Sequence, residues 1–468
     1  MFARGAGKQK DPKAMRSSHR ALAVAAIILL GGCGTYQPRP LDAARVAKAL
    51  PGRPLTAVWA AYSRRLLPAL PPLVVVAHQG LTPAAAAVWA VVGDPDLRAS
   101  RARVGIAQAQ LLAAGLLPNP VFSFGVGLPI SGLGLTSAFR AALSLPVQAL
   151  VTRPARVAAA RAQVRRVDLT LAWQAWQVAL HAKDDVYQLE LLNRERTVLH
   201  GEIGDLREQV ALLARGERAR LVTAGAALAA RVALRRAELE AVRAGALYRV
   251  KLLALKGLLG LKPRDALRLS AQKENPFRVP PDRRALLAGL AARRLDLIAL
   301  RAGYRAASAG MRAAVLGEFP PLSLGVNRAR DTTDVNTVGT DLSVALPIFN
   351  HNQGAVAIAR ANRRLVLRTY AARLSDARLK VTELMASMQT ARQEMSAHRQ
   401  MLKALLRLQG LYREALAQHA INALVYYRLA TQVTRERLRE IADAARLDQL
   451  GVALETESGW FDLPRAKT

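Results

Sequence analysis

The 468-residue sequence predicts a mainly α-helical fold with a small β part, in which one structural unit occurs twice. Three observations support this prediction. Residues recur at a spacing of 200 positions, four short segments alternate between apolar and small or polar residues, and two long stretches, 155–262 and 348–463, contain no proline. In each copy the predicted order is a helix, two strands and a long helical hairpin.

The duplication rests on residue types that seldom match by chance. The matches at an offset of 200 include Asp96-Leu97 with Asp296-Leu297, Pro120 with Pro320, Ser123 with Ser323, and Gly125-Val126 with Gly325-Val326. A Leu-Pro pair returns one residue out of step, at Leu145-Pro146 and Leu346-Pro347. We therefore predict two repeats, 94–263 and 283–452, each opening with a helix (94–116 and 283–315). A linker at 264–282 joins them, and a tail at 453–468 follows.

The β-like segments have the period-two pattern of strands. In the first copy the apolar residues are Phe122, Phe124, Val126 and Leu128, then Phe139, Ala141, Leu143 and Leu145. In the second copy they are Leu322, Leu324 and Val326, then Val338, Leu342, Val344 and Leu346. Small or polar residues alternate with them, among them Arg140, Ser144, Asp341 and Ser343. Polar connections at 129–135 and 328–336 are expected to be turns.

Each segment is close to the ~9–11 residues that a tilted strand needs to cross a bilayer. A small soluble sheet covered by helices is the alternative. About four strands cannot close a barrel, and lipid does not tolerate open sheet edges. If the strands span a membrane, several chains must therefore pool them, and a trimer with roughly twelve strands is a natural solution. Its lumen would then be lined by Arg140, Ser144, Asp341 and Ser343.

The proline-free stretches are predicted to be helices that pack on helices. Residues 154–215 as one helix would span ~90 Å, and reversals are expected near Gly216 and near His419-Ala420, with return helices at 219–258 and 421–450. A rod-like coiled-coil scaffold is the alternative. The second stretch has a heptad seam, with steps of three and four, at Leu367, Tyr370, Leu374, Ala377, Val381, Leu384, Met388, Ala391, Met395, His398, Leu402 and Leu405.

The first residues resemble an export signal. Arg16, His19 and Arg20 precede an apolar run at 21–30 that is too short to span a bilayer as a helix. The run ends in Leu-Gly-Gly-Cys, which resembles the bacterial lipoprotein box. This resemblance implies a signal peptide at 1–32, a lipid on Cys33, an N-terminal lipid-anchored segment at 33–93, and outer-membrane sorting, since Gly34 follows the cysteine. An ordinary signal with a coincidental cysteine is the alternative.

The composition favours long helices and leaves the charge to be explained. Hydrophobic residues make up 51% and aromatic residues only 5%, and the formal net charge is +34. The charge fits a solvated, arginine-rich helical surface, an exported protein in acidic surroundings, or a nucleic-acid binder. No basic cluster is interleaved with stacking aromatic residues, which argues against nucleic acid. A single cysteine excludes an internal disulfide framework.

Two segments resemble the TolC-like outer-membrane factors. Residues 96–120, ending in Gly115-Leu116-Leu117-Pro118-Asn119-Pro120, resemble the entry helix and first strand of that family. Residues 346–354, Leu-Pro-Ile-Phe-Asn-His-Asn-Gln-Gly, resemble its second junction between strand and helix. The residues of this segment are most similar to the branch of the family that is paired with heavy-metal and related efflux pumps. The resemblance covers residues 80–458.

The resemblance implies a homotrimer with a twelve-stranded outer-membrane barrel, continued by a helical tunnel through the periplasm. It implies a passive conduit for small molecules or metal ions, whose helical tips dock on a periplasmic adaptor and an inner-membrane, proton-driven pump. An exit duct for type I protein secretion is the alternative. The tips depart from the family: Gly216 is kept at the first, but Val222 stands in place of an acidic residue, and His419 and Val425 replace glycine and an acidic residue at the second.

The sequence predicts no catalytic, cofactor or metal site. The seven histidines lack metal-ligand spacing, and His398 is expected to be a core or pore-lining residue. Gly125-Val126-Gly127 lacks the helix start and acidic residue of a dinucleotide site, and Asp184-Asp185 is expected on a solvated helix face. The chain is therefore expected not to be an enzyme, and a soluble scaffold remains the competing class.

Overall fold

The computed structural model describes residues 37–49, 80–132, 134–270 and 275–460, in two units, Met1–Gly52 and Arg53–Thr468. Of the first unit, helix α2 (Ala43–Ala49) is described, and the Asp42 carboxylate accepts hydrogen bonds from the backbone N–H groups of Ala44 and Arg45 at its start. Cys33 and the predicted signal peptide lie outside the described residues. All that follows concerns the second unit.

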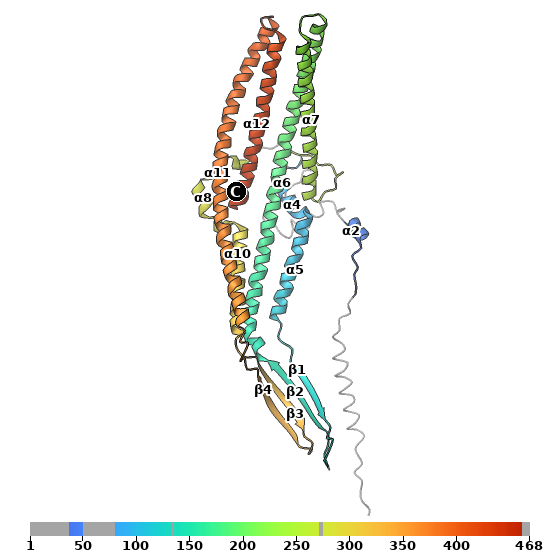
Figure 1. Cartoon of the computed structure of the whole chain (residues 1–468), viewed down its shortest axis with the longest axis vertical. Helices are drawn as coiled ribbons and strands as arrows, with labels where there is room; N and C mark the ends of the chain where they lie inside the picture. Colours follow the sequence, from blue (N-terminus) through green and yellow to red (C-terminus); the bar gives the residue numbers. More distant parts are fainter. Residues whose placement is uncertain (1–36, 50–79, 133, 271–274, 461–468) are drawn as a thin grey trace, which may run out of the picture. The chain divides into compact units, whose positions relative to one another are not determined.

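The predicted order of elements occurs twice (Figure 1). The first series is α4 (Pro83–Gly93), α5 (Pro95–Gly115), β1 (Val121–Gly127), β2 (Ala138–Pro146), α6 (Val147–Arg218) and α7 (Ala224–Leu258). After a 3-10 turn, η1 (Pro276–Arg278), the second series is α8 (Arg283–Ala288), α9 (Leu290–Arg293), α10 (Leu295–Leu316), β3 (Leu322–Arg330), β4 (Asn336–Val344), α11 (Gln353–Ala417) and α12 (Ala423–Ser458). The strands lie at one end of the unit and both hairpin turns at the other.

Three sequence predictions are corrected by these bounds. The single helix predicted over 283–315 is three helices, because the chain bends at Gly289 and takes extended backbone angles at Arg294. Helix α6 begins seven residues before Pro154, and the amide of Gln148 anchors its first turn by donating to the carbonyls of Gly317 and Phe319.

The second inter-strand turn is also shorter than predicted. Strand β3 continues to Arg330, so only residues 331–335 connect it to β4. The Asp331 carboxylate accepts hydrogen bonds from the backbone N–H groups of Thr333 and Val335, and Asp334 has a positive φ of 69°. A side chain that binds backbone N–H groups in this way closes a tight turn without help from glycine.

The four strands form one antiparallel sheet in the order β1-β2-β3-β4. The register pairs Phe124 with Ala141, Leu143 with Val326, and Leu324 with Leu342. Since directly paired residues point to the same face of a sheet, the apolar residues of all four strands share one face. This confirms the predicted alternation.

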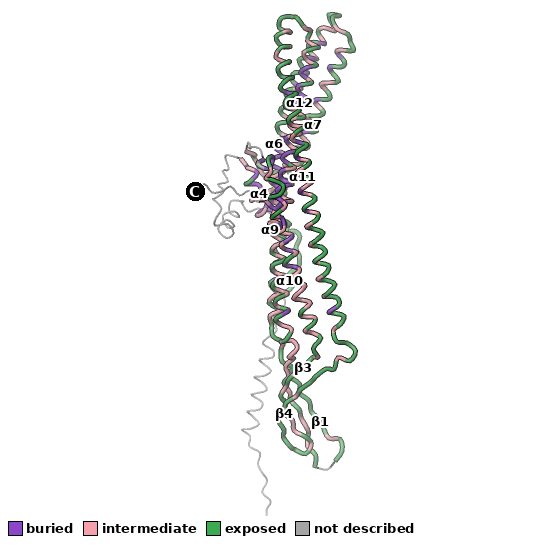
Figure 2. The backbone as a smooth tube through the Cα atoms, turned by 90° about the vertical axis from the view of Figure 1, so that its left-hand side faces the viewer, coloured by how far each residue is buried: buried purple, intermediate pink, exposed green. Residues whose placement is uncertain are grey.

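The helices pack in the pairs that the hairpins predict. Helix α6 packs on α7 and α11 on α12, while contacts of α6 with α10 and α12 join the two series. In the seam of α11, Ala377, Val381, Met388 and Ala391 are almost completely buried, whereas Leu367, nearer the sheet, is half exposed. Buried residues gather midway along the unit, and the sheet carries none of them (Figure 2). No helix among the described residues is long and apolar enough to cross a membrane.

Candidate functional site

The four residues predicted to line a lumen share one face of the sheet. In the register Ser144 pairs with Gly325, which pairs in turn with Asp341, while Ser343 pairs with Ser323. Arg140 also lies on this face, and its Nη2 donates to Oδ1 of Asp341 over 2.7 Å, across the intervening strand β3. That this face lines a lumen remains a prediction.

The opposite face of the sheet exposes large apolar side chains. Phe122 is 66% exposed, Phe124 60% and Leu342 66%, and the ring of Phe124 stacks on that of Phe139 with centroids 6.5 Å apart. The exposure of these side chains shows that no helix of the described residues covers them. A contiguous exposed apolar surface normally meets a lipid or a protein partner.

The two hairpin tips have the same backbone structure. At the first, the N–H of Leu221 donates to the carbonyl of Gly216, and Arg220 has a left-handed φ of 58°. At the second, the N–H of Ala420 donates to the carbonyl of Ala415, and His419 has a φ of 57°. This is the Schellman motif that commonly ends helices, usually with glycine at the left-handed position.

The shared backbone structure also aligns the residues of the two tips. Gly216 lies inside the last turn of α6, so it is not the left-handed residue, which is Arg220. The counterpart of Val425 is therefore Ala226 and not Val222. The backbone N–H of Ala226 donates to the side chain of Thr223, which caps the first return helix. The backbone N–H of Val425 donates in the same way to the side chain of Asn422, which caps the second.

Buried ion pairs join α12 both to η1 and to α6 of the first series. The guanidinium of Arg278 binds both carboxylate oxygens of Asp448, over 2.7 and 2.6 Å, and Lys183 Nζ lies 2.5 Å from Glu455. Tyr187 packs beside them, and burial, together with Asp448 and Glu455, raises the pKa of its phenol to about 12. These pairs were missed from the sequence, because their partners lie more than 160 residues apart.

Asp184-Asp185 is not a solvated helix face as predicted. Asp185 is completely buried in α6, with Oδ1 3.2 Å from Nζ of Lys251 on α7. Burial and the neighbouring Asp185 raise the pKa of Asp184 to about 6. The prediction failed because the local sequence does not show that α7 covers this side of α6.

His398 lies between α11 and α12, as expected for a core or pore-lining residue. Its Nδ1 is 2.6 Å from Oδ2 of Asp443, and its side chain is one-third exposed. In the described part of the chain, no three His, Cys, Asp or Glu side chains are grouped to hold a metal ion.

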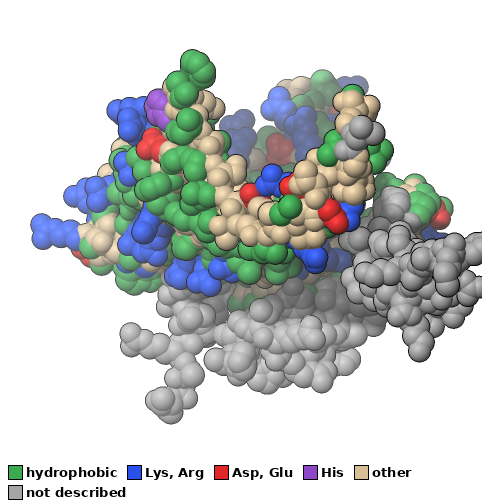
Figure 3. All heavy atoms as spheres, turned by 90° about the horizontal axis from the view of Figure 1, so that it is seen from below, with side chains coloured by type: hydrophobic (Ala, Val, Ile, Leu, Met, Phe, Trp, Pro, Cys, Tyr) green, Lys and Arg blue, Asp and Glu red, His purple; other side chains and the backbone are tan. Residues whose placement is uncertain are grey.

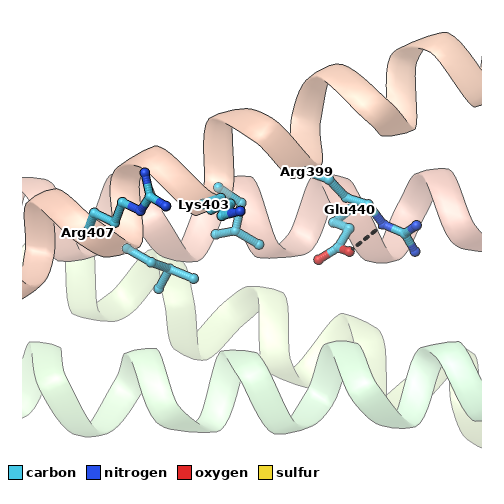
Figure 4. A pocket seen from close by; sticks show the side chains of 6 residues that line it. Arg399, Lys403, Arg407 and Glu440 are labelled. Atoms are coloured by element: carbon cyan, nitrogen blue, oxygen red, sulfur yellow. Dashed lines mark hydrogen bonds and ion pairs between the residues drawn. The ribbon is translucent and has the colours of Figure 1, made fainter.

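A shallow pocket of about 400 Å³ opens beside this hairpin (Figure 4). Three basic residues of α11, Arg399, Lys403 and Arg407, line it, and Arg399 pairs with Glu440 of α12 over 2.9 Å. Leu402 and Leu406 complete its wall. It is a charged groove along a helix pair, with no convergent set of nucleophile and base among the residues that line it.

Helix α7 has apolar residues on two opposite sides. Ala230, Ala237 and Ala244 are buried against α6. Residues about half a turn away form a second stripe, spaced at heptad intervals, which we call the outer stripe of α7. The outer stripe is 48–65% exposed and consists of Leu228, Val232, Leu239, Val242, Val250 and Leu253. A helix that is apolar on two sides needs a second partner.

No protein-family model matches this sequence, and no curated protein matches it. Solved outer-membrane channels share its fold. CusC, solved in a study of transmembrane channel formation, has a TM-score of 0.65 at 17% identity over 81% of this chain and 93% of that chain. VceC of Vibrio cholerae has a TM-score of 0.66 at 15% identity over 80% and 95%. The MtrE channel of Neisseria gonorrhoeae has a TM-score of 0.60 at 15% identity over 81% and 88%.

These structures are outer-membrane proteins and channels. Their similarity confirms the predicted resemblance for the fold. It does not extend to function, because the sequence identities are only 15–17%. This chain therefore has the same class of architecture, a pair of helical hairpins built on a small sheet.

Proposed function

We propose that this protein is the outer-membrane channel subunit of an efflux system, a passive conduit for small molecules or metal ions and not an enzyme. The observation that carries the proposal is the two-faced sheet, with exposed phenylalanines on one side and the Arg140–Asp341 pair on the other. Such a sheet suits a wall between lipid and water. The solved channels of the same fold support this assignment.

The conduit requires more than one chain. Strands β1 and β4 are the two edges of the sheet, and backbone groups in lipid must be paired. Three copies would supply twelve strands and close the edges on one another, as a barrel in the outer membrane. The outer stripe of α7 supports the same assembly, because a second copy would cover it and continue the helices as a periplasmic tunnel.

Anchoring and docking complete the proposal. A lipid on Cys33 would tether the chain to the outer membrane, and loss of acyl labelling in a Cys33→Ala variant would test this.

The hairpin tips would meet a periplasmic adaptor, which joins the channel to an inner-membrane pump. Non-glycine residues at both left-handed positions, Arg220 and His419, would distinguish this docking surface.

The two faces of the sheet can be tested with neighbouring cysteines. In a Cys33→Ala background, Ser144→Cys and Leu143→Cys place single thiols on the polar and apolar faces of β2. In protein reconstituted in lipid, a charged thiol reagent should modify the first at least about tenfold faster, because a thiolate forms in water and not in hydrocarbon. Ser343→Cys and Leu342→Cys repeat the comparison on β4. Equal rates within both pairs would place the sheet in water and remove the channel.

A further inference from the structure

The positive charge of the chain is concentrated in the helices next to the sheet. Helix α5 has three arginines and one carboxylate, the first 32 residues of α6 have five and one, α10 has three and one, and the first 23 residues of α11 have five and none. We call these four segments the basic collar. The remaining parts of α6 and α11, with α7 and α12, have 25 Lys and Arg against 20 Asp and Glu.

The segments of the basic collar lie side by side. Helix α6 packs on both α5 and α10, and α10 packs on α11. The view from the sheet end shows many more Lys and Arg than Asp and Glu side chains (Figure 3). Sixteen guanidinium groups against three carboxylates therefore occupy one level of the unit.

Neutral groups hold several of these guanidiniums in place. Arg153 donates to the carbonyl of Gly115 over 2.8 Å, Arg156 to that of Ala149 over 2.9 Å, and Arg166 to the side-chain amide oxygen of Gln163 over 2.9 Å. Arg373 makes two weak contacts with carboxylates, at 3.8 Å from Asp296 and 3.9 Å from Asp376. Neutral acceptors fix the side chains and leave their charge uncompensated, and arginine stays protonated at any ordinary pH.

A groove of about 680 Å³ opens within the collar between α6, α10 and α11. Arg156 and Arg166 line it together with Gly303 and Gly310, whose lack of side chains leaves space beside the charges. On α11, Arg360, Arg364 and Arg368 follow one another at one-turn intervals, and all three are exposed. The collar thus exposes positive charge at the surface of the unit next to the sheet.

We propose that the basic collar makes the conduit selective for anions, so that its cargo is a negatively charged solute. This rests on the proposed function as a channel. A tube with low-dielectric walls focuses the field of its charges and raises the local counter-ion concentration by about 10-fold or more. The same field disfavours free metal cations and other cationic cargo. It does not extend far through salt, since the Debye length is about 8 Å at 0.15 M.

The test uses the full chain reconstituted in planar bilayers of neutral lipid, with a tenfold gradient of potassium chloride. We expect a permeability ratio of chloride to potassium on the order of 10 at low salt, approaching unity near 1 M salt, where screening is almost complete. The triple variant Arg360→Gln, Arg364→Gln, Arg368→Gln should reduce the ratio at least about threefold.

The matched control removes the same charge from the other end of α11. Lys403→Gln, Arg407→Gln and Arg413→Gln lie outside the basic collar, and the ratio should stay within about twofold of the parent value. A channel without ion preference, or a control that shifts the ratio as much as the collar variant, overturns anion selection and leaves the channel intact. No conductance in any bilayer overturns the channel as well.

Anionic lipid headgroups are the other chemistry that arginines of this kind can bind. If the collar variant keeps its chloride preference but loses binding to vesicles that contain phosphatidylglycerol, the arginines serve the membrane surface. That result also overturns anion selection by the collar.

Discussion

Single residues that form buried ion pairs in the middle of the unit are expected to affect stability strongly. Arg278 and Asp448 are each about 90% or more buried and bind through two hydrogen bonds. A buried pair adds little net stability over apolar residues, but removal of one partner leaves a charge without compensation. The same geometry at the surface has little effect, because water replaces the lost partner.

We therefore expect Arg278→Ala to lower the free energy of unfolding by about 3–5 kcal/mol, since Asp448 stays buried without its partner. Chemical denaturation in detergent measures the difference. The control is Arg446→Ala, which removes an exposed pair with Glu394 and should cost less than about 1 kcal/mol. Equal losses in the two variants would contradict a special role for the buried pair.

Asp184 predicts a pH dependence of stability. Its pKa is about 6 in the folded protein and near 3.8 when unfolded, so the folded state binds the proton more tightly. Stability from this group is present below pH 4 and is lost as the pH rises through 6. Asp184→Asn should therefore stabilise the protein at pH 7 by on the order of 2 kcal/mol and have almost no effect at pH 4. A gain of the same size at both pH values would show that the carboxylate titrates normally.

At the scale of elements, periodicity determined what could be predicted. The alternation in the strands and the heptad seam of α11 follow from local spacing, and both agree with the register and burial in the structure. The burial of Asp185 depends on Lys251, a partner distant in the sequence, so spacing could not show it. Of the candidate site, the shared face of Arg140, Ser144, Asp341 and Ser343 was predictable, whereas their Arg–Asp bond across β3 was not.

The outer stripe of α7 gives a prediction for assembly. Val242→Glu places a carboxylate at its centre, and burial of an unpaired charge against a second copy costs several kcal/mol. We expect loss of assembly with unchanged helix content, measured by size-exclusion chromatography and circular dichroism. Arg236→Glu, on another exposed side of α7, is the control and should assemble normally. If Val242→Glu assembles like the parent, the stripe faces something other than a copy of this chain.

At the scale of the whole molecule, the described residues leave three surfaces without a partner. The sheet has two open edges, one of its faces exposes phenylalanines, and no described segment covers the outer stripe of α7. Identical copies arranged around an axis would pair the edges of the sheet and cover the outer stripe of α7. Lipid would cover the apolar face of the sheet. A conduit and a charged collar around it both require this closure, because a single copy encloses no lumen.

The mass of the protein part of the detergent-solubilised full chain tests this closure most directly. Light scattering combined with absorbance, or native mass spectrometry, gives that mass without assumptions about shape. We expect three copies, stable to dilution. A particle that contains one copy at every concentration would contradict it.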